Sequence, residues 1–121
     1  MGKYVIKQGK TGSYFVLKAA NGEIIGRSEM YSSEAAAKNG VESVKKNAAV
    51  AQIEDQTVEG WKNVANPVFE LYKDKAGEFR FRLRARNGEP ILASEGYSAK
   101  ASATGGIESV RKNADSEVVQ E

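Results

Sequence analysis

The sequence contains no cysteine and no histidine, and only two of its 121 residues are proline. Without cysteine it has no disulfides, thiolate nucleophiles, zinc–thiolate sites or iron–sulfur ligands, and without histidine it lacks the commonest general base and metal ligand. Most catalytic constellations therefore cannot be assembled. We expect a protein that is not an enzyme and that uses no cofactor or metal.

Long apolar runs are also absent. No stretch approaches the roughly 18 apolar residues of a membrane span, and residues 1–10 lack the continuous apolar segment of a signal peptide. The charge is nearly balanced, because 18 Lys and Arg face 16 Asp and Glu, which leaves a net charge of +2. These features predict one compact cytoplasmic domain without a membrane partner.

An internal repeat organises the chain. Three motifs recur at an offset of 66 residues: Asn21–Glu23 at Asn87–Glu89, Ser28–Ser32 at Ser94–Ser98, and Val41–Ala48 at Ile107–Ala114. Upstream the offset is 65 residues, as from Gly12 to Gly77. We therefore divide the chain into a first repeat (1–58), a connector (59–67) and a second repeat (68–121), which together form one compact domain.

Each repeat has the pattern of three strands followed by a helix. In the second repeat, apolar residues alternate with arginines over residues 79–86, which is typical of a strand with one buried face. The Asn-Gly pairs that follow predict two-residue hairpin turns of type I′, in which both central residues have positive φ. Helices are expected over residues 33–47 and 99–113, with Gly40 and Gly106 marking a close approach to the sheet. Residues 50–58 and 117–120 are candidates for a short final strand in each repeat.

The pattern Gly-x-Phe-x-Phe-x-Leu-x-Ala-x-Asn-Gly at Gly77–Gly88, Ser-Glu-x-Tyr at Ser94–Tyr97 and Gly-Ile-x-Ser-Val-Arg at Gly106–Arg111 resembles the YegP-like proteins. These are small bacterial proteins of uncharacterised function, built from one or two such units. The resemblance covers nearly the whole chain. It implies an α+β fold in which both repeats share one antiparallel sheet with two helices packed on one face, and terminal strands exchanged between repeats. It implies no activity, catalytic residue or ligand.

The most distinctive candidate site is a row of four arginines on one strand face: Arg80, Arg82, Arg84 and Arg86. Such spacing suits a phosphate backbone, with Tyr14, Tyr72 and Trp61 as stacking surfaces for single-stranded nucleic acid. The alternative is a solvent face of cross-strand ion pairs, with Glu70 opposite Arg82, Glu89 opposite Arg86 and Glu95 opposite Arg80. We favour the paired face.

A second candidate is an apolar surface on the sheet face opposite the helices. The two-residue turns place four residues on that face: Tyr14, Val16, Ile25 and Ile91. The other repeat's terminal strand, a second subunit or a partner would cover them, and packing within the chain is the interpretation we favour. Trp61 in the connector either docks on the core, which we favour, or marks a contact surface.

The remaining candidate chemistry is a pair of carboxylates, Glu42 and Glu108, at equivalent positions of the repeat. Because both lie beside basic residues on a helix, we interpret them as surface ion pairs. The sequence thus leads to a non-enzymatic protein that binds another protein or its own copy through the sheet face and edge strands. Nucleic-acid or other polyanion binding by the arginine row is the alternative.

Overall fold

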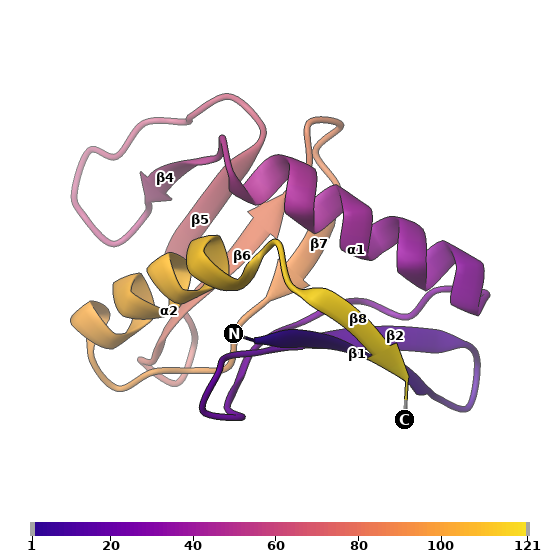
Figure 1. Cartoon of the computed structure of the whole chain (residues 1–121). Coiled ribbons are helices and arrows are strands. Elements are labelled where there is room, and N and C mark those ends of the chain that lie inside the picture. The colour runs from indigo at the N-terminus through magenta and orange to yellow at the C-terminus, as the bar shows by residue number, and fades with distance from the viewer. Residues whose placement is uncertain (1, 121) are drawn as a thin grey trace.

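Each repeat forms three strands, a helix and a short final strand in the computed structural model, which describes residues 2–120 (Figure 1). The first repeat contains β1 (Lys3–Gln8), β2 (Ser13–Lys18), β3 (Ile24–Arg27), α1 (Glu34–Ala48) and β4 (Gln52–Asp55). The second contains β5 (Val68–Lys73), β6 (Phe79–Arg84), β7 (Pro90–Ala93), α2 (Lys100–Asn113) and β8 (Glu117–Gln120). The α+β fold class and the β-β-β-α-β repeat expected from the sequence are confirmed.

All eight strands belong to one sheet, and its order shows that the repeats exchange their final strands. The order is β4-β5-β6-β7-β3-β2-β1-β8. β4 of the first repeat pairs with β5 of the second, while β8 of the second pairs with β1 of the first, and both pairings are parallel. The sheet is therefore mixed rather than wholly antiparallel, because each exchanged strand follows a helix that crosses over the sheet.

A pseudo-twofold axis passes through the centre of the sheet. There β3 pairs with β7 in antiparallel orientation, with Arg27 opposite Ala93, and these two residues are equivalent positions of the repeat. Only an arrangement with twofold symmetry places equivalent residues opposite each other in an antiparallel pair. Everything at the middle of the sheet is consequently built from both repeats.

Both helices pack on the same face of the sheet, and each of them contacts strands of both repeats. α1 lies over β1 and β2 and also over β6 and β7, and α2 lies over β2, β3, β5 and β6. A helix of 15 residues, the length of α1, is about 22 Å long, which spans four to five strands at about 4.8 Å each. Each helix thus carries its chain from its own repeat to the edge of the other repeat (Figure 1).

The turns at the two Asn-Gly pairs differ from the predicted type I′ turns. Gly22 and Gly88 both have φ of 87°, but no other residue type among residues 2–120 has positive φ, so Asn21 and Asn87 do not. The amide of Gly88 donates to the Ala85 carbonyl oxygen, and the amide of Ala85 donates to that of Glu89. These bonds close a loop of three residues, the hairpin in which a type I turn is followed by a glycine bulge.

This extra loop residue changes which way the isoleucines of β3 and β7 point. Arg84 now lies opposite Pro90, and a register shift follows before Leu83 meets Leu92. The inserted Ile91, and Ile25 at the same place in the first repeat, turn to the helix face and join the buried core. The prediction that Ile25 and Ile91 lie on the outer face is therefore wrong.

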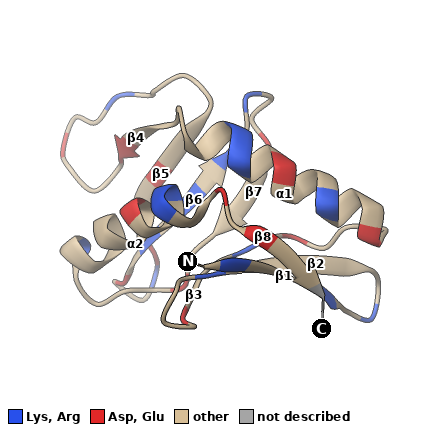
Figure 2. Ribbon diagram, viewed as in Figure 1, with Lys and Arg blue, Asp and Glu red and all other residues tan. Residues whose placement is uncertain are grey.

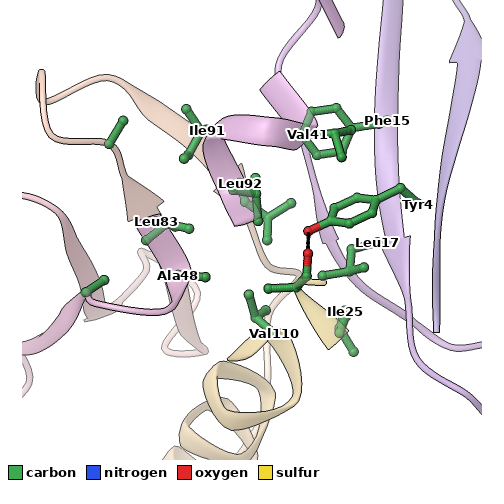
Figure 3. Packing of buried hydrophobic residues seen from close by; sticks show 14 of the residues in the cluster. Tyr4, Phe15, Leu17, Ile25, Val41, Ala48, Leu83, Ile91, Leu92 and Val110 are labelled. Carbon is green, nitrogen blue, oxygen red and sulfur yellow. Dashed lines mark hydrogen bonds between the residues drawn. The ribbon is translucent and has the colours of Figure 1, made fainter. Parts of the chain in front are cut away.

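The aromatic core is duplicated in nearly the same geometry. Tyr4 meets Phe15 edge-on at 5.8 Å between ring centroids, and Phe69 meets Phe81 edge-on at 6.2 Å. The Tyr4 hydroxyl donates a 2.6 Å hydrogen bond to the carbonyl oxygen of Ala114 just beyond α2 (Figure 3). Burial raises the pKa of Tyr4, which therefore stays neutral and keeps this donor.

The repeated Ser-Glu-x-Tyr motif has a structural role. The Ser28 hydroxyl accepts from the amide of Phe15 and donates to the Glu29 carbonyl oxygen, and Ser94 does the same for Phe81 and Glu95. The tyrosines of the two motifs stack on Phe15 and Phe81 at 6.2 and 6.5 Å. The motif thus extends the pairing of β2 beyond β3, and of β6 beyond β7, rather than presenting reactive groups.

Two further sequence expectations concern the surface. Trp61 is 43% exposed and is not part of the hydrophobic core, so the prediction that it docks on the core is wrong. Within residues 2–120, neither helix combines the length and the apolar character that crossing a membrane requires.

Gly106 supports the expectation of close helix–sheet approach, since a Cβ there would lie 2.8 Å from both the Phe81 ring and the Tyr97 hydroxyl oxygen. At Gly105, on the exposed side of the same helix, a Cβ would meet nothing within 4 Å. We predict that Gly105→Ala raises the free energy of unfolding by about 0.5–1 kcal/mol through helix propensity. Gly106→Ala lowers it by about 1–2 kcal/mol, because overpacking outweighs that gain.

Urea unfolding followed by circular dichroism measures both variants. Equal stabilisation by the two substitutions would show that α2 does not need the space at Gly106.

Candidate binding groove

A groove of about 740 Å³ lies on the sheet face opposite the helices, along the central strands. Its apolar lining comes from both repeats and includes Val16, Ile24 and Pro90, of which Ile24 is the most exposed at 42%. The polar residues that line it are Lys7, Tyr14, Arg27, Ser28, Glu29, Tyr72, Arg80, Arg82, Ser94 and Glu95. A volume of this size is within the range of about 300–1,000 Å³ that is typical of ligand sites.

The groove follows the pseudo-twofold axis, because nearly every lining residue has its repeat equivalent in the lining as well. Tyr14 corresponds to Arg80, Val16 to Arg82, and Arg27 to Ala93. The positions are symmetric but the side chains are not. On the helix side of the same strands Gly26 corresponds to Leu92, and a Cβ on Gly26 would lie 2.6 Å from the buried Leu92 side chain, so only one large residue fits there.

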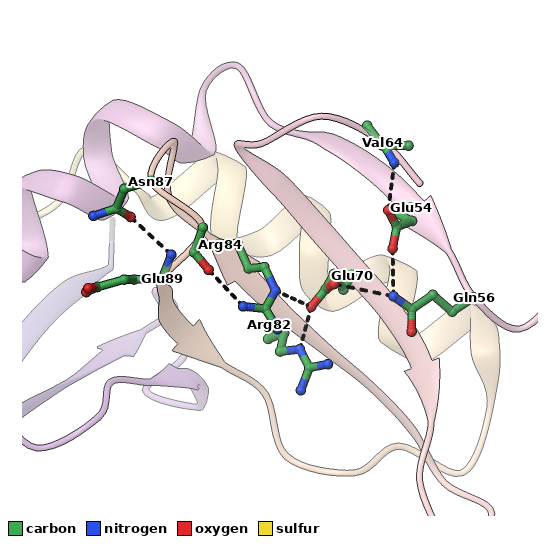
Figure 4. Close-up of polar contacts among 9 residues, drawn as sticks. Glu54, Gln56, Val64, Glu70, Arg82, Arg84, Asn87 and Glu89 are labelled. Atoms are coloured by element: carbon green, nitrogen blue, oxygen red, sulfur yellow. Dashed lines mark hydrogen bonds and ion pairs between the residues drawn. The ribbon is translucent and has the colours of Figure 1, made fainter. Parts of the chain in front are cut away.

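Three of the four arginines in the predicted row are tied to carboxylates. Arg80 Nε lies 2.6 Å from Asp74 Oδ2, and Glu70 Oε1 accepts from Arg82 Nε at 2.5 Å and from Arg84 Nε at 2.7 Å (Figure 4). The predicted pairing of Glu70 with Arg82 is confirmed.

Two other predicted pairs are wrong. Arg80 pairs with Asp74 instead of Glu95, and two residues, Glu95 and Gly96, lie opposite Arg80 between the Phe81–Ser94 hydrogen bond and the Phe79–Tyr97 bridge. Arg86 does not face Glu89, because it lies in the three-residue loop.

A second, buried carboxylate completes the network around the arginines. Glu54 on β4 is 4% exposed and accepts from the Val64 amide at 2.7 Å and from Gln56 Nε2 at 2.6 Å (Figure 4). Gln56 also reaches Glu70 at 3.4 Å. Two carboxylates, Glu54 and Glu70, therefore offset the two guanidinium charges beside them, which weakens the attraction of this strand for a polyanion. Figure 2 shows the same mixture of signs along both helices.

Glu70 is held in its ionised form by this arrangement. Burial acts to raise the pKa of Glu70, but the hydrogen bonds from Arg82 and Arg84 outweigh it, and the pKa is lowered below its ordinary value. The hydrogen bond from Arg80 likewise lowers the pKa of Asp74. Arg80, Arg82 and Arg84 are thus paired with ionised carboxylates at neutral pH.

One line of residues crosses the outer face with one member from each strand. We call it the cross-sheet row, and its order is Glu54, Glu70, Arg82, Ala93, Arg27, Val16, Val5, Val119. The half from β4, β5 and β6 is ionic, while the half from β2, β1 and β8 is apolar. Because each ionic residue has an apolar equivalent across the axis, the groove has chemically different walls.

The predicted surface residues divide between the groove and other places. Tyr14 and Val16 line the groove as expected, and Trp61 lies in the connector. Sequence reasoning missed Arg27, whose guanidinium lies 4.5 Å above the Tyr14 ring. Alternation of outward and inward side chains along β3 would have indicated Arg27, but the bulge in this strand interrupts that alternation. Glu54 was also missed, because the sequence does not give the register in which the exchanged strand β4 pairs with β5.

Glu42 and Glu108 form exposed ion pairs within their helices, with Lys45 at 3.7 Å and Arg111 at 2.6 Å. The interpretation as surface pairs is confirmed. No group of three side chains suited to holding a metal ion occurs among residues 2–120.

We predict that Glu70→Gln lowers the free energy of unfolding by about 1–3 kcal/mol at pH 7, because Arg82 and Arg84 lose a charged acceptor. The folded-state pKa of Glu70 is depressed, so its contribution is complete above the ordinary value of 4.5 and disappears as pH falls through the lower folded value. Urea unfolding at pH 7 and at about pH 3 measures the difference between the wild type and the variant at each pH.

Glu108→Gln is the control, because its exposed pair with Arg111 contributes less than about 0.5 kcal/mol. A difference at Glu70 that is as large at low pH as at neutral pH would contradict the ionised network.

Comparison with known proteins gives the family of the chain. The model of the domain of unknown function DUF1508 matches twice, at residues 10–55 and 74–121. The UPF0339 protein YegP of Yersinia pestis is 42% identical over 122 residues, covering 100% of this chain and 96% of its own. A UPF0339 protein of Treponema denticola is 58% identical over 53 residues, which cover 44% of this chain and 91% of that protein.

The solution NMR structure of YegP from E. coli, a protein of unknown function, has a TM-score of 0.80 and 30% identity, covering 99% of this chain and 92% of that one. Relatives and structural neighbour alike are proteins for which no specific activity is given, and the sequence-based resemblance is confirmed. The chain belongs to the YegP-like family of tandem DUF1508 proteins.

Proposed function

We propose that this is a non-enzymatic protein that binds an extended segment of a partner protein in the groove on the outer face of its sheet. The observation that carries the proposal is the groove itself, which is centred on the pseudo-twofold axis and has an apolar floor between arginine and tyrosine walls. An apolar centre with a polar rim, rich in Tyr and Arg, is the composition of protein contact sites.

The sheet topology supports the face of the sheet over its edges as the contact surface. Strand exchange pairs β1 with β8 and β5 with β4, so the long edges of both repeats are satisfied within the chain. The edges that remain are β4 and β8, which have four residues each. Edges this short offer few main-chain hydrogen bonds to an added strand.

The charges support a protein partner over nucleic acid. Arg80, Arg82 and Arg84 are each bonded to a carboxylate, and Glu29 and Glu95 also line the groove. A phosphodiester backbone would bring several negative charges into a strip that is already balanced. A peptide with a few charges and apolar side chains meets no such penalty.

The test uses the exposed Ala93 on the groove floor. Random peptides displayed on phage are selected against the wild type, and the selected peptides are then measured against Ala93→Trp, which fills the groove. We expect the variant to weaken their binding at least about tenfold, since the indole occupies the contact site. Ala101→Trp, on the exposed side of α2, is the matched control and should bind as the wild type does.

Failure to enrich any peptide, or equal binding by Ala93→Trp, would refute the groove as a peptide-binding site. Fluorescence anisotropy with the isolated peptides gives the affinities.

A further inference from the structure

Two arginines face each other across the groove floor, separated by one small residue. In the cross-sheet row Arg82 on β6 lies beside Ala93 on β7, and Ala93 lies beside Arg27 on β3. Two strand spacings place the arginine backbones about 10 Å apart. Since the residue between them has only a methyl side chain, the row leaves an open position between two long cationic side chains.

Each of these arginines is held in place by a tyrosine. The Arg27 guanidinium lies 4.5 Å from the centre of the Tyr14 ring, and that of Arg82 lies 4.7 Å from the centre of the Tyr72 ring. Glu70 additionally fixes Arg82 through its Nε. Side chains that are already ordered lose little conformational entropy when they bind a ligand.

The terminal nitrogens distinguish these two arginines from their neighbours. Arg80 Nη1 donates to the Ser94 carbonyl oxygen, and Arg84 Nη1 donates to that of Gly88. The terminal nitrogens of Arg27 and Arg82 donate no hydrogen bond to any residue in 2–120, and in Figure 4 those of Arg82 point away from Glu70. Both forks of donors are thus preorganised and unused.

We propose that Arg27 and Arg82 clamp a single carboxylate of the partner segment, presented by a Glu or Asp side chain, above Ala93. This inference rests on the proposed function and names the group that the groove recognises. A carboxylate matches the guanidinium fork through two parallel N–H···O bonds. Ile24, which is 42% exposed, and Pro90 line the same groove and accept apolar neighbours of that acid, and Glu29 and Glu95 oppose a second negative charge.

The probe is the blocked tripeptide acetyl-Val-Glu-Leu-amide, titrated to about 10 mM and followed by ¹⁵N NMR, including the arginine Nε–Hε signals. Acetyl-Val-Gln-Leu-amide is the uncharged control. We expect saturable shifts at Arg27, Arg82 and Ala93 with the first peptide only, and at least about tenfold weaker binding in Arg27→Gln and Arg82→Gln. Arg86→Gln is the matched control, because Arg86 is exposed in the loop outside the groove.

Arg82→Lys keeps the positive charge but removes the two parallel donors of the guanidinium group. We expect this variant to bind as weakly as Arg82→Gln, since a lysine cannot form the bidentate pair. The amide spectra also report whether each variant remains folded.

Four outcomes would overturn the clamp. Equal chemical-shift changes in the groove with both tripeptides would be consistent with peptide binding but would show that the carboxylate is not recognised. Full affinity in Arg82→Lys would show that the bidentate guanidinium pair is not needed. An absence of shifts with the Glu peptide would overturn the clamp even if phage selection yields groove-binding peptides. A ten-nucleotide oligothymidylate that shifts the same signals, and binds about tenfold or more weakly at 200 than at 50 mM salt, would replace the carboxylate by nucleic-acid phosphate.

Discussion

The exchange of final strands between the repeats is the constraint on which the rest of the structure depends. A three-stranded unit alone would expose its first strand as an edge, with unpaired N–H and C=O groups. Here β8 covers β1 and β4 covers β5, and each helix must cross the axis to deliver its strand. Neither repeat can therefore complete its sheet without the other, and the core lies across the boundary between them.

This coupling explains why the aromatic residues on the helix face of the sheet are similar in the two repeats, while the residues on the outer face differ. Phe15 and Phe81, with their stacked tyrosines, repeat the same packing because both helices press on the same interior. On the outer face Val5 corresponds to Glu70 and Val16 to Arg82. Val5 and Val16 are outside the core cluster on which the helices pack, so these outer positions can differ between the repeats without disturbing the helices.

The sequence predicts the fold well because the fold depends on local signals that occur twice. The alternation along β6 and the motifs at equivalent positions identify strands, helices and their order. The hairpin at Asn87 could not be read correctly, because an Asn-Gly pair fits both a two-residue turn and a three-residue loop with glycine at the bulge. That single residue decides whether Ile91 points to solvent or to the core.

Only part of the groove could be predicted from the sequence, for a related reason. Glu70 lies opposite Arg82 through a hairpin, and hairpin register can be counted along the chain. Glu54 and Arg27 reach the same row through a parallel pairing and through contact between the repeats. No spacing in the sequence encodes such contacts, because their register is set by how the helices cross the sheet.

The pairing of the arginines with acids changes what those arginines can recognise. An unpaired row would attract any polyanion through its net charge, with little selectivity and a strong dependence on salt. Glu70 removes much of that general attraction, yet it bonds only Nε of Arg82 and leaves the terminal nitrogens directed away. Recognition then depends on the geometry of hydrogen bonds more than on charge. A groove with these properties favours a ligand that places one anionic group at one position over a ligand that is merely negative.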